Sequence, residues 1–132
     1  MTTSTELAKR WPNSKHWGGW RLGMVDALTG AVCFSVALDG TPIFIVPGDP
    51  LWHPRRIANA VPDLDHTGTR AFLLEDVRRA WEAAGAPVGA YTWTCSHYGG
   101  WRCDSMGGES YPRNSACETE AAALIAALEG AP

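Results

Sequence analysis

Two short segments of this chain concentrate residues that can hold a ligand or a partner. Residues 16–21 read HWGGWR and residues 97–102 read HYGGWR, so five of the six positions are identical. The paired glycines allow positive φ and a tight reversal of the chain. The flanking imidazole, aromatic rings and guanidinium suit a binding surface, but they specify no reaction. We therefore predict two similarly built loop corners whose tips bind.

A third segment carries the same chemistry. Residues 52–56 read WHPRR and lie in a proline-rich region. We predict that the aromatic, histidine and arginine residues of the three segments form the binding site: His16, Trp17, Trp20, Arg21, Trp52, His53, Arg55, Arg56, His97, Tyr98, Trp101 and Arg102.

These side chains suit more than one kind of partner. Trp, Tyr and Arg are enriched at the centres of protein interfaces. The same rings can stack on a base while the guanidinium groups pair with phosphates. A protein partner and a nucleotide-like ligand both stay open, as does a homodimer that brings the similar segments together. The net charge of −3 favours the protein partner.

Metal binding and catalysis find less support in the residue pattern. Cys95, His97, Cys103 and Cys117 do not show the short C-x2-4-C spacing of structural zinc sites, and a lone buried cysteine usually behaves as a small hydrophobe. We predict no metal, no cofactor and reduced thiols. No G-x-S-x-G elbow or catalytic cysteine signature occurs, so we predict a non-enzyme. A hydrolase with His97 or His16 as general base is the remaining alternative.

Composition sets the broad class of the protein. The chain has 132 residues, of which 45% are hydrophobic and 19% charged, and this predicts one folded domain over residues 1–132. The interspersed charges argue against a general binder of duplex nucleic acid. The polar N-terminus and short apolar runs predict no targeting segment, no membrane span and a cytoplasmic protein.

The elements of the first half must position the first and third segments. Within residues 1–15, Thr3 and Glu6 form a capping box that predicts a short helix over residues 3–11 and a loop after it. Strands are predicted at residues 20–26, 31–38 and 41–46, with Asp-Gly at positions 39–40 as a tight turn, giving an antiparallel meander. A long proline-rich connection follows at residues 47–68, with one helical turn over residues 54–60.

The second half contains two helices around a hairpin. Thr69 is the predicted cap of a helix over residues 70–84 that exposes Asp76, and Ser115 the cap of a helix over residues 117–128. Between them, residues 90–106 form a hairpin. The elements together predict an α+β domain, in which an antiparallel sheet, made of the meander and the hairpin, carries two main helices.

The hairpin register follows from which residues must share a face. A two-residue Gly-Gly turn would put Cys95 and Cys103 on opposite faces. A three-residue turn pairs Cys95 with Cys103 and His97 with Trp101, and it gathers Trp93, both cysteines and Trp101 on one apolar face. We predict the three-residue turn.

The order of elements in the second half resembles that of a known group. The helix TRAFLLEDVRRAWE (residues 69–82) is followed by a Trp-containing strand pair (residues 93–103) and by the Ala-rich helix ETEAAALIAAL (residues 118–128). In these features the chain resembles small phage-encoded proteins described as the phage α-β-α sandwich type. The resemblance covers about half of the chain and leaves residues 1–67 outside.

The resemblance implies a viral or mobile-element origin and carries over no catalytic residue. Small phage proteins of this kind commonly bind host proteins, among them antagonists of host defence. The expected function is therefore that of a non-catalytic, anti-CRISPR-like inhibitor of a host defence protein complex, acting in the host cell cytoplasm.

Overall fold

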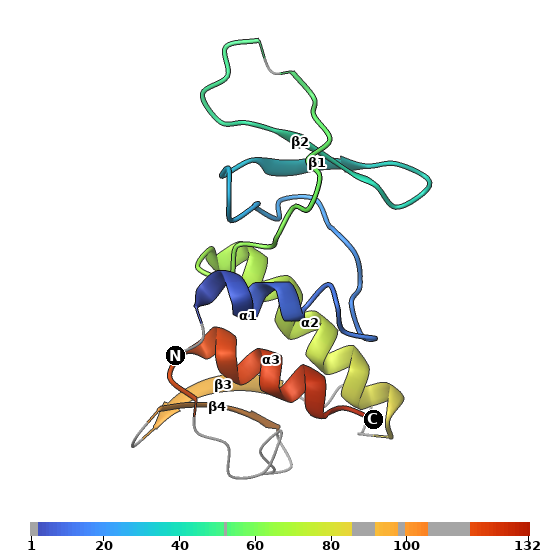
Figure 1. Ribbon diagram of the computed structural model, residues 1–132. Coiled ribbons are helices and arrows are strands. Elements are labelled where there is room, and N and C mark those ends of the chain that lie inside the picture. Colours follow the sequence, from blue (N-terminus) through green and yellow to red (C-terminus); the bar gives the residue numbers. More distant parts are fainter. Residues whose placement is uncertain (1–2, 52, 86–91, 98–99, 106–116) are drawn as a thin grey trace. The chain divides into compact units, whose positions relative to one another are not determined.

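The chain folds into helices and antiparallel strands. The computed structural model describes residues 3–51, 53–85, 92–97, 100–105 and 117–132. These residues contain three helices and two antiparallel strand pairs in the order α1–β1–β2–α2–β3–β4–α3 (Figure 1). The predicted α+β class is confirmed.

The chain groups into two compact units. Unit 1 comprises Met1–Asn13 and Gly18–Phe72, and unit 2 comprises Ser14–Trp17 and Leu73–Pro132. Each unit contains one strand pair, so the described strands form two separate two-stranded sheets where the sequence predicted one. The expectation of a single domain stays a prediction.

Unit 1 opens with the helix α1 (Ser4–Arg10), and its predicted capping box is confirmed. The Glu6 amide donates to the Thr3 hydroxyl, and the Thr3 amide donates to the Glu6 carboxylate, both at 3.1 Å. The helix ends at its C-cap Trp11, directly before Pro12, because proline lacks the amide hydrogen that the next helical bond needs. The Trp11 side chain is fully buried.

The predicted hairpin of unit 1 is also confirmed. β1 (Val32–Val36) pairs with β2 (Pro42–Ile45), and the Asp-Gly turn joins them with Gly40 at φ +86°. The Ala37 amide donates to the Thr41 carbonyl at 2.9 Å and closes the turn. Figure 1 shows this end of the hairpin as a loop extending beyond the two strands.

A small core lies under the other end of the hairpin. Cys33 and Phe44 are paired across the strands and buried together with Ala31. A bulge at Phe34 shifts the register next to this core, and no residue between positions 35 and 43 is buried. Partly buried residues complete the core: Trp20, Val46, Ile57 and Ala60.

The strand predicted at residues 20–26 is not formed. A turn at residues 21–24, with Gly23 at φ +93°, interrupts it. What remains is an isolated bridge between Val25 and Val32. The meander is therefore a hairpin with one short bridge along the edge of β1.

A buried carboxylate holds part of the long connection in place. Asp26 is fully buried and accepts hydrogen bonds from the Thr29 amide (3.1 Å), the Thr29 hydroxyl (2.6 Å) and the Val61 amide (2.9 Å). Buried carboxylates persist when their oxygens are satisfied in this way. The proline-rich connection is thereby anchored near its end.

The helical turn predicted at residues 54–60 is wrong. The backbone groups of Arg55 exchange two hydrogen bonds with Phe44, at 2.7 and 2.8 Å, which draws this residue into a bridge with β2. Asn59 then takes φ +58°, a left-handed conformation that a right-handed helical turn does not contain. The proline-rich segment thus extends the edge of the sheet.

The helix α2 (Thr67–Ala83) begins three residues before the predicted start. The His66 Nδ1 accepts the Thr69 amide hydrogen at 3.1 Å, which is the bond that an N-cap side chain makes. Thr69 is buried inside the first turn, where its hydroxyl accepts the Val25 amide at 3.1 Å. The predicted cap role of Thr69 is wrong because this imidazole takes it.

The hairpin of unit 2 has a different register from the predicted one. β3 (Thr92–His97) pairs with β4 (Gly100–Ser105) so that His97 lies opposite Gly100. Cys103 then lies opposite Thr94, and Cys95 opposite Arg102. The predicted pairs of Cys95 with Cys103 and His97 with Trp101 are therefore wrong, and positions 95 and 103 fall on opposite faces of the ladder.

Pairing of the Cys117 backbone with β4 accounts for this register. The Trp101 amide donates to the Cys117 carbonyl at 2.7 Å, and the Cys117 amide donates back to Trp101 at 2.8 Å. Gly100 has φ +146°, and a Cβ atom there would lie 2.4 Å from the Cys117 carbonyl oxygen. The hairpin pairing accommodates this close backbone approach, which the sequence did not reveal.

The helix α3 (Glu120–Gly130) closes unit 2. Its N-cap is Thr119, whose hydroxyl accepts the Ala122 amide at 3.1 Å, so the predicted start at position 117 is wrong. Ser115, the predicted cap, lies outside the described residues. Extended pairing of the backbone at position 117 delays the helix until the next capping residue.

The Ala-rich face of α3 packs on β3 and β4 (Figure 1). The Trp81 indole of α2 donates to the Ala127 carbonyl at 2.9 Å, which ties the second half of α2 to α3. The buried residues of α3 and β4 are mostly small or aliphatic: Cys103, Ala121, Ala123, Leu124, Ile125, Ala127 and Leu128.

Candidate functional site

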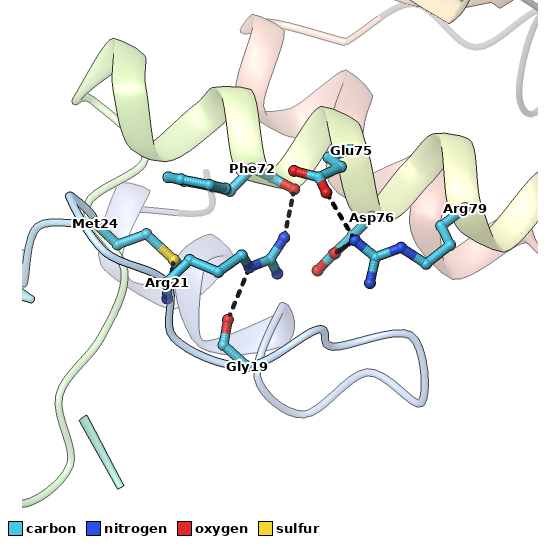
Figure 2. A network of polar contacts seen from close by, with 7 residues as sticks. All are labelled: Gly19, Arg21, Met24, Phe72, Glu75, Asp76 and Arg79. Atoms are coloured by element: carbon cyan, nitrogen blue, oxygen red, sulfur yellow. Dashed lines mark hydrogen bonds and ion pairs between the residues drawn. The ribbon is translucent and has the colours of Figure 1, made fainter. Parts of the chain in front are cut away.

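Two predicted binding residues of unit 1 are engaged within the fold. The Trp20 ring meets the Phe44 ring edge-on, with centroids 5.0 Å apart. Arg21 donates to the carbonyls of Gly19 (3.1 Å) and Phe72 (3.3 Å), as Figure 2 shows. Its guanidinium also lies over the rings of Trp11 and Phe72, at 5.8 and 5.3 Å. Both side chains therefore stabilise unit 1.

Two predicted binding residues belong to unit 2: His16 lies beside the C-terminal end of α3, and Trp17 lies in a turn. The His16 Nε2 is within hydrogen-bonding distance (3.3 Å) of the carbonyl of the buried Ala131. The Trp17 amide donates to the Ser14 carbonyl at 3.1 Å, and the Trp17 side chain is half-buried. The imidazole that could serve as a general base is thus bonded to the main chain.

The described residues of the second six-residue segment belong to two paired strands, β3 and β4. Trp101 and Arg102 are half-buried residues of β4. His97 ends β3, and its side chain is outside the described part of the chain, as is Tyr98 entirely. Residues 18–21 belong to unit 1, whereas residues 16–17 and 97–102 belong to unit 2, so the first segment is divided between the two units.

Sequence reasoning missed a buried charge on α2. Asp76, predicted on the outer face, is 1% exposed, and its Oδ1 lies 3.7 Å from Arg79. Arg79 also pairs with Glu75 at 3.0 Å, one helical turn earlier (Figure 2). The i, i+3 and i, i+4 spacing of these charges was readable in the sequence, but the burial of Asp76 was not.

The third segment takes part in an exposed surface. His53, Arg55 and Arg56 are exposed, whereas Trp52 lies outside the described residues. Arg55 donates to the Asp49 carboxylate at 3.1 Å. The histidine and the two arginines of the segment therefore lie at the surface of unit 1, as a binding role requires.

Two exposed leucines precede and follow β2 in the chain. Leu38, at the turn of the hairpin, is fully exposed, and Leu51 is 68% exposed. Leu51 is held by its amide, which donates to the Asp49 carboxylate at 3.0 Å. We call the whole set the tip-and-loop surface: Leu38, Asp39, Asp49, Leu51, His53, Arg55 and Arg56.

Two carboxylates order the backbone of this surface. The Thr41 amide donates to Asp39 at 2.9 Å, and this bond, with a smaller attraction to Arg56, lowers the pKa of Asp39. The Leu51 amide is the main cause of the lowered pKa of Asp49, with Arg55 adding a smaller effect. Both groups are charged at neutral pH, and the Asp49 carboxylate accepts hydrogen bonds from both the Leu51 amide and the Arg55 guanidinium.

The leucines were not among the predicted site residues. Leu38 directly precedes the Asp-Gly turn, and a large apolar residue beside a tight turn is the signal that could have identified it. The whole group of exposed large hydrophobic side chains in the described residues lies in unit 1: Leu22, Leu28, Phe34, Val36, Leu38 and Leu51.

No group of three metal-ligating side chains occurs among the described residues, and no disulfide joins Cys33, Cys103 or Cys117. No helix in the described part of the chain has the length and apolar character needed to span a membrane. Comparisons with protein-family models, curated proteins and solved structures found no match to this chain.

Proposed function

We propose that this chain is a non-catalytic protein-binding protein that contacts a host protein complex through the tip-and-loop surface. The observation that carries the proposal is the fully exposed Leu38, next in sequence to the charged and exposed Asp39 at the tip of the hairpin. Exposed apolar side chains rimmed by polar groups are typical of protein interaction sites, and arginine is enriched there. Following the resemblance to phage proteins, we propose a host defence component as the partner and the host cytoplasm as the place of action.

The charge pattern supports a protein partner over a nucleotide-like ligand. Arg55 is paired with the Asp49 carboxylate at 3.1 Å, and Arg56 exerts a small attraction on Asp39. Trp20 and Arg21, which a nucleotide site would use for stacking and phosphate pairing, make their contacts inside unit 1. A neutral, partly apolar surface fits a protein better than it fits a phosphate.

Site-specific cross-linking in a bacterial host tests the proposal. Leu38→p-benzoylphenylalanine should cross-link to one defined host protein, because the benzophenone replaces a side chain at the proposed contact. The matched control is Leu28→p-benzoylphenylalanine, which labels an exposed position of the same unit outside the surface. Equal labelling from both positions, or from neither, contradicts the proposed surface.

A ligand titration addresses the nucleotide alternative directly. Intrinsic tryptophan fluorescence of the full chain should not change saturably with nucleoside mono-, di- and triphosphates or cyclic dinucleotides. Saturable quenching by any of them, removed by Arg55→Ala or Arg56→Ala, would overturn the proposal in favour of nucleotide binding.

A further inference from the structure

β1 lies within a segment whose composition is typical of strands that pair readily. Residues 31–38 read AVCFSVAL, eight residues without a charge, a glycine or a proline. Val and Phe favour extended structure, and uncharged segments of this kind readily add further strands. Such a segment is usually protected when it lies at the edge of a sheet.

The outer edge of β1 is covered only at its start. The Gly23 amide donates to the Cys33 carbonyl and the Cys33 amide donates to the Met24 carbonyl, both at 2.8 Å. Beyond the bulge at Phe34, none of the described residues pairs with this edge. Beyond the bulge, the backbone groups that are directed to this outer edge therefore have no strand partner among the described residues.

The opposite edge of the hairpin is protected in two ways. Pro42 of β2 has no amide hydrogen to offer, and Phe44 is bonded on that side to Arg55. Charged residues, prolines and bulges are the usual devices that keep an edge from pairing. β1 carries no charge and no proline, and its bulge at Phe34 lies before Val36, so the two edges differ in what they can bind.

The direction of the backbone groups identifies the centre of the open edge. Because the Ala37 amide donates inward to Thr41, the preceding Val36 has its N–H and C=O directed to the open edge. Val36 lies opposite Pro42, which is consistent with a pair that exchanges no hydrogen bonds. The exposed side chains of Phe34 (43%) and Val36 (39%) lie along this stretch.

From these observations we propose that two copies of this chain pair through the outer edges of β1, antiparallel, about a two-fold axis at Val36. A two-fold interface must be self-complementary, and a strand without charges meets its own copy without repulsion. Val36 of each copy would donate to and accept from the same residue of the other. The product is a four-stranded sheet in the order β2–β1–β1–β2, with a tip-and-loop surface from each copy.

Sedimentation equilibrium on the full chain tests the proposal from about 1 to about 200 µM. The native chain should approach twice its 14.2 kDa mass as concentration rises. Val36→Lys should stay monomeric, because it places two ammonium groups together at the axis. The matched control Leu28→Lys, at an exposed leucine away from the edge, should still dimerise.

A second variant keeps the test valid if the lysine disturbs folding. Val36→Cys should form an intermolecular disulfide on mild oxidation, because directly opposite strand residues lie within disulfide reach. Leu28→Cys should not form one. A monomeric native chain, a dimer that survives Val36→Lys, or no cross-link through Val36→Cys overturns the proposal. Partner binding at the tip-and-loop surface is measured in a separate experiment, so failure of the dimer and failure of the proposed function are distinguishable.

Discussion

The two six-residue segments share five residues, but their described parts differ in backbone conformation and in the contacts that they make. In HWGGWR, Gly19 has φ +85° and open space around it, and the next two residues pack inside unit 1. In HYGGWR, Gly100 begins a strand and lies against the Cys117 backbone. The described residues of the first copy form a loop, whereas those of the second copy belong to β3 and β4. The prediction of two similar corners stays a prediction, because residues 98 and 99 lie outside the described part of the chain.

The difference shows how little a shared hexapeptide determines by itself. The paired glycines permit both conformations, and contacts distant in sequence select between them. Trp20 is fixed by Phe44, whereas Trp101 is fixed by backbone bonds to Cys117. The same residue types consequently stabilise two different structures.

Replacing the second glycine of each segment with alanine should give the largest effect on stability and the clearest difference between the segments. Gly100→Ala places a methyl group 2.4 Å from a carbonyl oxygen, and the backbone must move to relieve the clash. We expect a loss of about 3 kcal/mol in the free energy of unfolding. Gly19→Ala meets no atom and should cost about 1 kcal/mol through its left-handed φ alone. Urea unfolding measures both, and equal losses would remove the distinction between the two segments.

Removing the arginine of the first segment should have the next largest effect. Arg21→Ala loses two hydrogen bonds to carbonyls and the stacking on Trp11 and Phe72. We expect the free energy of unfolding to fall by about 2 kcal/mol. Arg21→Lys is the control and should recover only part of this loss, because lysine lacks the planar fork. If Arg21→Ala left stability unchanged, the arginine would have no structural role.

Acidification should have the smallest effect on stability, and this effect should be limited to unit 1. The lowered pKa values of Asp39 and Asp49 mean that their carboxylates stabilise the fold above the pKa of an unfolded aspartate, about 4. This contribution disappears as the pH falls through the folded pKa. We expect the amide resonances of Thr41 and Leu51 to shift in that range. Asp39→Asn and Asp49→Asn should each abolish one of these shifts, and an unchanged titration would contradict the assignment.

Local signals in the sequence predicted local structure correctly. The capping box of Thr3 and Glu6 and the Asp-Gly turn at positions 39–40 are stabilised by hydrogen bonds that span two to four residues. A short window of sequence contains both partners of such bonds. The α+β class followed from these elements and from the helical periodicity of α2 and α3.

Contacts between distant residues account for several of the predictions that failed. The hairpin register of unit 2 accommodates Cys117, which lies seventeen residues after Gly100. The cap of α2 failed for a local reason: His66 bonds the Thr69 amide, and histidine has no strong statistical preference for the cap position. In the candidate site, His53, Arg55 and Arg56 are exposed as expected. The engagement of Arg21 depends on Phe72, which the sequence could not place.

The affinity of the cross-linked host protein for purified variants tests the central claim most directly. Leu38→Asp should weaken binding at least about tenfold, equal to about 1.4 kcal/mol, because it buries a charge at the proposed contact. Leu28→Asp, a matched change at another exposed leucine of unit 1, should change the affinity less than about twofold. Equal affinities of the two variants for the host protein would contradict the assignment of binding to the tip-and-loop surface.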